Sequence, residues 1–390
     1  MWEVLWAVSN RQSPRGSWRG SPRRGNSESL EPRLIHNLHK AATMTIGRFF
    51  EDFQLGERIQ HATPRTLTDG DAAQYLALYG SRFAQYCAAP YAAACGFAKT
   101  PLDPLLVFHV AFGKTVPDVS LNAVANLGYA DLRFLQPVFA GDTLFVDSEV
   151  IGLKENSNGK TGVVYVQSRA QNQHGEPVLQ WQRWVMVHKR NPAILTGHND
   201  VPNTKAQLSA AELPVPHGLK VPDEQNYYTG SSKTARDYKV NDVISHGGGI
   251  TIGDSDHMLA TRLYQNNARV HFDAAYMQQQ PAGKRLVYGG HIISLVQAQS
   301  YNGLENALWL AGFNGGVHAN PSFAGDTIYA ASVIKDVQPL ANKLSAVRVV
   351  SFGIKGEPGE LLANLPALAD GAPLPANVVL KWDYWLLMPH

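Results

Sequence analysis

The chain has few cysteines, few charged residues and no long apolar run. Its 390 residues include only two cysteines, Cys87 and Cys95, which argues against a disulfide framework and predicts a reducing, cytoplasmic location. Neither cysteine has a CxxC partner, so both are expected to be small buried hydrophobic residues. No stretch approaches the roughly 18 apolar residues that suggest a membrane-spanning helix, so no membrane role is expected.

Charged residues make up 17% of the chain, and their formal net charge of +2 is unevenly distributed. Seven basic and three acidic residues give residues 1–43 a net charge of +4, which leaves −2 for the remainder. The body of the protein therefore shows no sign of a nucleic-acid surface. Residues 1–43 lack periodicity and predict a disordered extension. An Arg-rich transit peptide is the alternative, against which the three glutamates argue.

The most informative feature is an internal repeat. The motif P-V-F-A-G-D-T at residues 137–143 returns as P-S-F-A-G-D-T at 321–327, 184 residues later. The pair Thr66 and Asp71 recurs as Thr251 and Asp256, 185 residues later. Matches at a nearly constant spacing indicate repeated structural units, so the chain is predicted to be a tandem duplication.

The repeat divides the chain into an extension and two similar units. The predicted segments are an N-terminal extension at 1–43, a first unit at 46–190, a linker at 191–235 and a second unit at 236–390. The linker is rich in Pro, Asn, Gly and Thr, which favours a semi-extended connection that lets the units pack side by side.

The sequence pattern of each unit predicts an α+β fold. Residues 69–78 and 254–263 begin with helix-capping types and continue with helix formers, and second helices are expected at 90–97 and 292–301. Runs rich in β-branched and aromatic residues predict strands; these runs are 143–151, 162–168, 180–188, 327–334 and 378–388. A helix followed by long strands favours a curved antiparallel sheet wrapped around one helix.

Several strings resemble a known family. The turn TLTDGD at 66–71 and the twin P-x-F-A-G-D-T motifs resemble the MaoC-like hydratases of the hot-dog superfamily. The strings ATRLYQNNARVHF at 260–272 and YGGHIISL at 288–295 are similar to the mesaconyl-CoA (2-methylfumaryl-CoA) hydratase family in particular. The resemblance covers nearly all of 49–389 and is less clear over 335–376. It implies a tandem hot-dog fold, with each half a curved antiparallel sheet around a central helix.

Adding water to an enoyl thioester requires a base, an acid and donors for the enolate oxygen. MaoC-like hydratases place an Asp and a His five residues apart; the resemblance assigns the His position to His271 and the Asp position to Asn266. An amide cannot ionise. Either His271 supplies the proton chemistry while Asn266 positions water, or a nearby carboxylate, Asp256 or Asp273, takes the missing role.

The first unit lacks this pair. Ser81 and Tyr86 stand where Asn266 and His271 stand in the second unit. The N-terminal domain is therefore predicted to be non-catalytic and to complete the acyl-CoA tunnel of a single active site.

The resemblance also implies a substrate site. Gly290, at the amino end of the central helix, would stabilise the enolate through a backbone N–H. Tyr264 is predicted to bind substrate, while His291 either lines the pocket or packs within the helix. A mesaconyl group carries a carboxylate, which suits an arginine. The candidates are Arg269, ranked first for its closeness to His271, Arg262 and Arg82.

The function implied is that of a hydro-lyase that reversibly hydrates mesaconyl-CoA to β-methylmalyl-CoA, as in glyoxylate and acetyl-CoA assimilation. The expected partner is an acyl-CoA thioester; no cofactor or metal is expected, since CoA is part of the substrate, and a homo-oligomer is expected. The alternatives are an (R)-specific enoyl-CoA hydratase of another substrate range, an acyl-CoA thioesterase and a non-catalytic acyl-CoA-binding protein.

Overall fold

The computed structural model describes residues 47–390, and the predicted extension at 1–43 lies outside them. The first half is built from helices and strands in the order η2 (Phe50–Asp52), β1 (Arg58–Thr66), α1 (Asp69–Tyr79), α2 (Ala84–Cys87), α3 (Ala89–Ala94), α4 (Pro104–Thr115), η3 (Val116–Ser120), β2 (Ala123–Phe134), β3 (Thr143–Glu155), β4 (Thr161–Gln171) and β5 (Pro177–His188).

The second half repeats this order after a connecting segment. The connector contains β6 (Asn199–Asp200), η4 (Ala210–Glu212) and α5 (Gln225–Thr229). The second half comprises η5 (Ala235–Asp237), β7 (Val243–Ser245), β8 (Ile250–Thr251), α6 (Asp254–Leu263), η6 (Arg269–His271), α7 (Ala274–Gln278), α8 (Gly289–Ser300), β9 (Trp309–His318), β10 (Thr327–Pro339), β11 (Leu344–Lys355), α9 (Leu361–Ala369) and β12 (Val378–Pro389).

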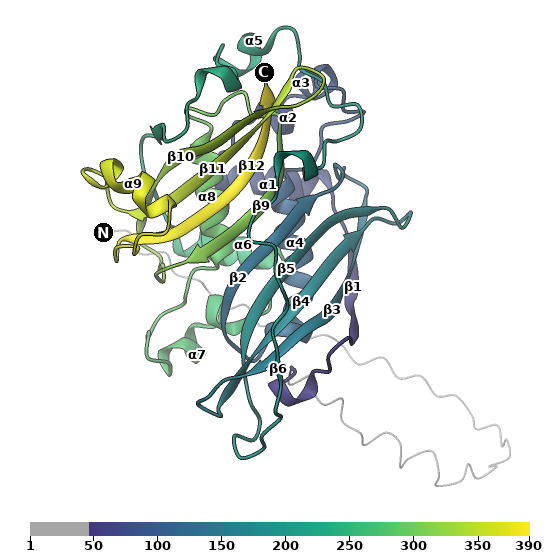
Figure 1. The fold of residues 1–390 in the computed structure, drawn as a ribbon, viewed down its shortest axis with the longest axis vertical. Coiled ribbons are helices and arrows are strands. Elements are labelled where there is room, and N and C mark those ends of the chain that lie inside the picture. The colour runs from purple at the N-terminus through teal and green to yellow at the C-terminus, as the bar shows by residue number, and fades with distance from the viewer. Residues whose placement is uncertain (1–46) are drawn as a thin grey trace, which may run out of the picture. The chain divides into compact units, whose positions relative to one another are not determined.

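The strands of the described residues form one continuous sheet. Its order is β1-β3-β4-β5-β2-β9-β12-β11-β10-β7, so the second half mirrors the first about the β2–β9 junction. At that junction Ala130 pairs with Gly315 and Leu132 with Phe313 in antiparallel register. The two halves are therefore joined edge to edge as a tandem hot dog, with the helices held against the curved sheet (Figure 1).

The repeated P-x-F-A-G-D-T motif forms the same turn twice. In the first half the carboxylate of Asp142 accepts a hydrogen bond from the N–H of Phe139 at 2.8 Å, and Asp326 accepts from Phe323 at the same distance. Each turn also needs a glycine at positive φ, which Gly141 supplies in the first half at +102°. The motif thus sets the entry to β3 and β10.

The strands repeat a buried polar chain as well. In each half a histidine ring nitrogen bonds a serine hydroxyl on one strand, and that hydroxyl bonds a serine on the next strand. The two chains are His61–Ser148–Ser168 and His246–Ser332–Ser351, with links of 2.6–2.8 Å. Side-chain geometry therefore supports the equivalence of the halves independently of the turn motif.

The central helices are α4 and α8. Helices were predicted at 292–301, where α8 lies, and at 90–97, where the shorter α3 lies. These two helices are not equivalent, because α4, 185 residues before α8, is the central helix of the first half. Every residue of α4 is buried, so α4 has no polar face that periodicity could reveal.

The pseudo-twofold axis passes between the helices of the two halves. The hydroxyls of Tyr79 and Tyr264, equivalent residues at the ends of α1 and α6, bond each other at 2.7 Å. The hydroxyl of Tyr79 also lies 3.0 Å from Nδ1 of His291. On the central helices, Nε2 of His109 lies 3.1 Å from the hydroxyl of its counterpart Ser294. Polar contacts between equivalent positions thus tie the halves together.

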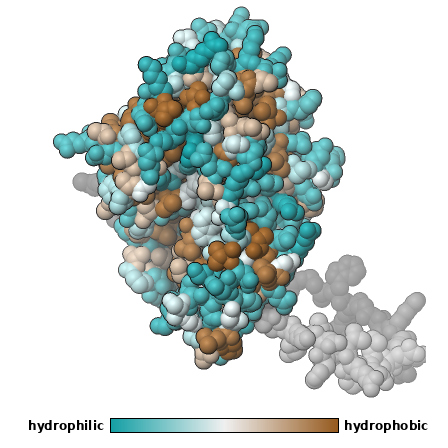
Figure 2. All heavy atoms as spheres, viewed as in Figure 1, coloured by the Kyte–Doolittle hydropathy of each residue, from teal (hydrophilic) through white to brown (hydrophobic). Residues whose placement is uncertain are grey.

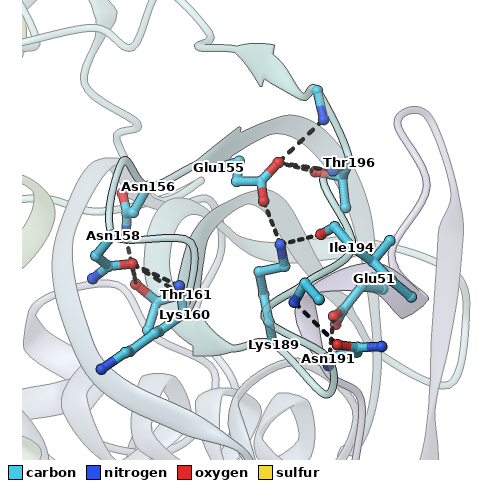
Figure 3. A network of polar contacts seen from close by, with 12 residues as sticks. Glu51, Glu155, Asn156, Asn158, Lys160, Thr161, Lys189, Asn191, Ile194 and Thr196 are labelled. Carbon is cyan, nitrogen blue, oxygen red and sulfur yellow. Dashed lines mark hydrogen bonds and ion pairs between the residues drawn. The ribbon is translucent and has the colours of Figure 1, made fainter.

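The connector is held at both the surface and the core. At its start, the buried ammonium of Lys189 donates to Glu155 and to the Ile194 carbonyl, while Glu155 also accepts from Thr196 (Figure 3). Further along, Leu208 is fully buried, and its N–H donates to the side chain of Asn314 in β9 at 2.8 Å. The segment is therefore part of the fold as well as a link.

The surface shown in Figure 2 is mainly polar with small apolar groups between. No helix within residues 47–390 has the length and apolar character to cross a membrane. Cys95 is buried as expected, but Cys87 is exposed, which corrects the prediction for that residue. Its thiol lies at the end of α2, 3.3 Å from the Ser81 carbonyl.

Candidate active site

A cavity of about 380 Å³ opens between the two halves, beside the amino end of α8. The second half contributes His271, Asn266, Gly289 and His318 to its wall. The first half contributes the start of β2, the end of α4 and a residue of β5, represented by Ala123–Asn126, Phe112, Tyr129 and Arg183. A site made by both halves follows from the pseudo-twofold packing, because α4 and β2 lie next to the second half.

His271 presents one ring nitrogen to the cavity. Its Nδ1 lies 2.9 Å from the carbonyl oxygen of Leu286, and since a carbonyl can only accept, Nδ1 carries the proton. The other nitrogen, Nε2, is then an unprotonated acceptor. Burial lowers the pKa of His271 to about 4, so the ring is neutral at physiological pH. The histidine is in the form that a general base requires.

Asn266 lies in the same cavity wall. Its side chain is buried, and its Oδ1 accepts a hydrogen bond from the N–H of Ala268 at 3.0 Å. That contact fixes the orientation of the amide, with its oxygen occupied and its NH₂ group as the donor that can reach a ligand. The structure therefore brings Asn266 and His271 together, as the five-residue spacing predicted.

Neither predicted replacement carboxylate lies in the cavity. Asp256 is exposed in the first turn of α6, and Asp273 caps α7 by accepting from the Tyr276 N–H at 2.9 Å while it pairs with Arg269. Among the described residues that line the cavity, none is Asp or Glu. The alternative in which a protein carboxylate replaces the family Asp has no support in this geometry.

The predicted arginines also lie elsewhere. Arg269, Arg262 and Arg82 are exposed, and none of them lines the cavity. The guanidinium of Arg269 is held by Asp273 at 2.7 Å and covers the ring of Tyr276 at 4.4 Å. Arg269 is close to His271 in sequence, but it does not reach the cavity. The side chains of these two η6 residues point in different directions.

The other predicted substrate residues lie behind the wall. At the start of α8, Gly289 lines the cavity, whereas Gly290 faces His109, whose ring would lie 2.6 Å from an added Cβ. His291 and Tyr264 are buried in the hydrogen-bonded contact with Tyr79 and do not line the cavity. Gly289 still places the amino end of α8 at this wall.

His318 and Arg183 line the cavity but were not among the predicted site residues. His318, at the end of β9, is close enough to His271 for the two rings to influence each other, and burial lowers its pKa to about 4. Arg183 is fully buried in β5, between the inward-facing Trp181 and Val185. The signal for Arg183 was present in the sequence: a charged residue at an inward-facing position of an alternating strand.

Tyr86 holds in the first half the position that His271 holds in the second. Tyr86 is buried, and its ring packs against Trp309 of the second half at 6.5 Å between centroids. Trp309 also contacts Phe97 at 5.9 Å. Aromatic packing thus occupies the place where the second half has His271.

The fold and the cavity define a double hot-dog protein of the MaoC-like class. A dehydratase described as a MaoC domain protein from Chloroflexus aurantiacus superposes with a TM-score of 0.84 at 47% identity, over 90% of this chain and 99% of that one. A Mycobacterium tuberculosis protein described as having a double hot-dog fold gives a TM-score of 0.68 at 26% identity, over 88% of this chain and 98% of that one.

The sequence comparisons are more specific. The family model described as mesaconyl-CoA hydratase matches residues 31–354. β-Methylmalyl-CoA dehydratase of Chloroflexus aurantiacus is 50% identical over 88% of this chain and 97% of its own length. Mesaconyl-CoA hydratase of Cereibacter sphaeroides is 48% identical over 88% and 98%. The chain belongs to the mesaconyl-CoA hydratase family.

Proposed function

We propose that this chain reversibly hydrates mesaconyl-CoA to β-methylmalyl-CoA, with His271 as the proton-transfer residue. The observation that carries the assignment of the site is the neutral imidazole of His271, held by Leu286 with Nε2 directed to a cavity at the start of α8. The names of the two relatives, a dehydratase and a hydratase, describe the two directions of one reaction.

The chemistry follows from the protonation state. In hydration, Nε2 of His271 accepts a proton from water as the water oxygen attacks the β-carbon of the enoyl thioester. The electrons of the double bond move toward the thioester oxygen, and the imidazolium then gives its proton to the α-carbon, which restores the neutral histidine. In dehydration the neutral Nε2 removes the α-proton, and the imidazolium gives it to the departing hydroxyl group, which leaves as water. Asn266 donates through its NH₂ group and orients the water or hydroxyl.

The enolate oxygen requires donors that are already in place. The first N–H groups of α8 have no partner within the helix and lie at the positive end of its dipole. Gly289 lines the cavity, and a Cβ there would lie 2.5 Å from the ring of His318, so the position requires glycine. The amino end of α8 is the proposed oxyanion site.

The test is a direct assay. Purified protein incubated with mesaconyl-C1-CoA should consume the enoyl thioester absorbance and yield β-methylmalyl-CoA, with no free CoA detected by a thiol reagent. Stoichiometric release of CoA would identify a thioesterase instead. Binding of the thioester without turnover would identify a non-catalytic acyl-CoA-binding protein.

We further propose that the protein acts in the cytoplasm as a homo-oligomer, with acyl-CoA as its small-molecule partner and no cofactor beyond the CoA of the substrate. Light scattering of the purified chain tests the oligomeric state.

A further inference from the structure

Arg183 is a buried cation without a protein counterion. It is fully buried, yet among the described residues it makes no ion pair, and its Nε and one terminal nitrogen lack any hydrogen-bond partner. Its contacts are weak ones: a terminal nitrogen lies 3.4 Å from the Ser120 hydroxyl, and the guanidinium carbon lies 4.4 Å from the centroid of the Phe112 ring. Burial lowers its pKa to about 10, so it stays charged at neutral pH.

An uncompensated guanidinium in the interior is costly to the folded protein. Such a group is retained where a ligand supplies the missing charge. Arg183 lies in the wall of the same cavity as His271, and this wall contains no carboxylate among the described residues. The amide of Asn126, in the same wall, also has both polar atoms buried and unpartnered. The cavity therefore offers one positive charge and spare donors to an anionic group.

We propose that Arg183 binds the free carboxylate of the acyl group and makes the enzyme selective for acyl thioesters with a second, ionised carboxyl group. Phe112 supports one face of the guanidinium, so its nitrogens are presented in a fixed plane. The inference rests on the proposed function, because it assigns the distal end of a substrate whose reacting carbons lie near His271. It replaces Arg269, which is exposed and already paired.

The experiment compares two substrates with the same carbon skeleton on Arg183→Met. Tiglyl-CoA has a methyl group where mesaconyl-CoA has its free carboxylate. Arg183→Met should lower kcat/KM for mesaconyl-CoA by roughly 10²- to 10³-fold, as expected when one partner of a buried charge pair is removed, and should leave tiglyl-CoA within a few-fold. Arg169→Met, an exposed arginine on the adjacent β4, is the matched control and should retain the preference for mesaconyl-CoA.

A second measurement does not depend on turnover. The saturated thioesters succinyl-CoA and butyryl-CoA differ in the same carboxylate, and calorimetry should show tighter binding of succinyl-CoA by the wild type and equal binding by Arg183→Met. The melting temperature of Arg183→Met should equal or exceed that of the wild type. This result would show that the variant has lost a substrate contact and has not misfolded. If wild type does not hydrate mesaconyl-CoA, the proposed function fails while the binding comparison still decides the role of Arg183. A preference for the carboxylated thioester that survives Arg183→Met, or that is lost in Arg269→Met instead, overturns the inference.

Discussion

The two halves of the molecule share one topology and differ in the size of a few side chains near the pseudo-twofold axis. In the second half's cavity the start of β2 presents Val124 and Ala125. The residues 185 positions later, at the start of β9, are Trp309 and Leu310, which are buried against the first half. Small residues leave space beside His271, and large ones occupy the space beside Tyr86.

The two halves therefore contribute different residues to the cavity. The first half lacks the His–Asn pair but supplies Arg183, Phe112 and Tyr129 to the wall of its neighbour's site. At the place in β12 that corresponds to Arg183 stands Tyr384, whose hydroxyl is satisfied by Ser351 at 2.9 Å. The cavity draws its wall from both halves, so neither half is expected to work alone.

Separating the halves should therefore have the largest effect. Residues 235–390 expressed alone should aggregate or lack all activity although they contain His271, because the β2 edge and half of the cavity wall are missing. Activity and solubility of this fragment, with and without co-expressed residues 47–234, provide the measurement. A fragment that is soluble and fully active would show that the first half is dispensable.

His271→Ala should lower kcat by roughly 10²- to 10⁴-fold, the usual range for loss of a general acid or base. KM should change far less, because the imidazole acts mainly in the transition state. The matched change in the other half, Tyr86→Phe, removes a hydroxyl that has no partner and should leave kcat nearly unaltered. Wild-type turnover in His271→Ala would contradict the assignment and make His318, the other histidine in the cavity wall, the next residue to test.

Asn266→Asp should be more damaging than Asn266→Ala. Two negative charges about 4 Å apart at an effective dielectric near 20 repel by roughly 4 kcal/mol, so a carboxylate here opposes the carboxylate of the substrate. Steady-state kinetics on mesaconyl-CoA and tiglyl-CoA separates the effects, since repulsion should disappear with the uncharged acyl group. Equal activity of Asn266→Asp and wild type on mesaconyl-CoA would mean that a neutral group is not needed.

Val124→Trp would place in the cavity wall the residue that stands at the equivalent position of β9, Trp309. Val124 is 49% exposed, so the larger ring should be tolerated by the fold while it narrows the site. We expect KM for mesaconyl-CoA to rise by about 10-fold or more with little change in melting temperature, as over-filling a binding site displaces its ligand. Val124→Ala, which enlarges the site, is the control, and unchanged KM in Val124→Trp would remove this explanation of the asymmetry.

The smallest effect concerns pH. His271 and His318 have folded-state pKa values of about 4, lowered by burial from an ordinary value near 6.5. Between these values the unfolded chain binds more protons, so stability rises with pH across this window and is lost as pH falls from about 6.5 to 4. Urea unfolding at several pH values should show this slope, and His271→Gln should reduce it. Tyr86→Phe should leave it unchanged.

The comparison of halves also explains what the sequence could and could not reveal. The repeat, the α1 and α6 helices and most outer strands were predictable, because turn motifs and β-rich runs are local signals. The central helix α4 was not, since every one of its residues is buried. Strand β2 was not predicted either, because its small residues Ala123, Ala125 and Gly128 have weak strand preference. Ala123 and Ala125 leave space for the cavity, and Gly128 leaves space for Trp184.

The site was predictable where its residues are close in sequence. The five-residue spacing predicted His271 and Asn266 as partners, and both line the cavity. Arg183 lies 88 positions before His271 in the chain and reaches the cavity through the sheet, so nearness in sequence favoured Arg269 wrongly. The local sequence can indicate that an arginine on a strand is buried, but it cannot show whether acidic residues neutralise that arginine. Only the packed structure shows that the nitrogens of Arg183 lack partners.

The bond between Tyr79 and Tyr264 shows what fusing two copies makes possible. In a dimer of identical subunits, a hydrogen bond between the same tyrosine of each copy has no preferred direction. Either hydroxyl can donate to the other, and the two arrangements have equal energy. Here the hydroxyl of Tyr79 also lies 3.0 Å from Nδ1 of His291, a second polar partner that Leu106, the counterpart of His291, cannot offer to Tyr264. One difference between the halves therefore makes the two arrangements of the tyrosine bond unequal, which two identical subunits related by symmetry cannot achieve.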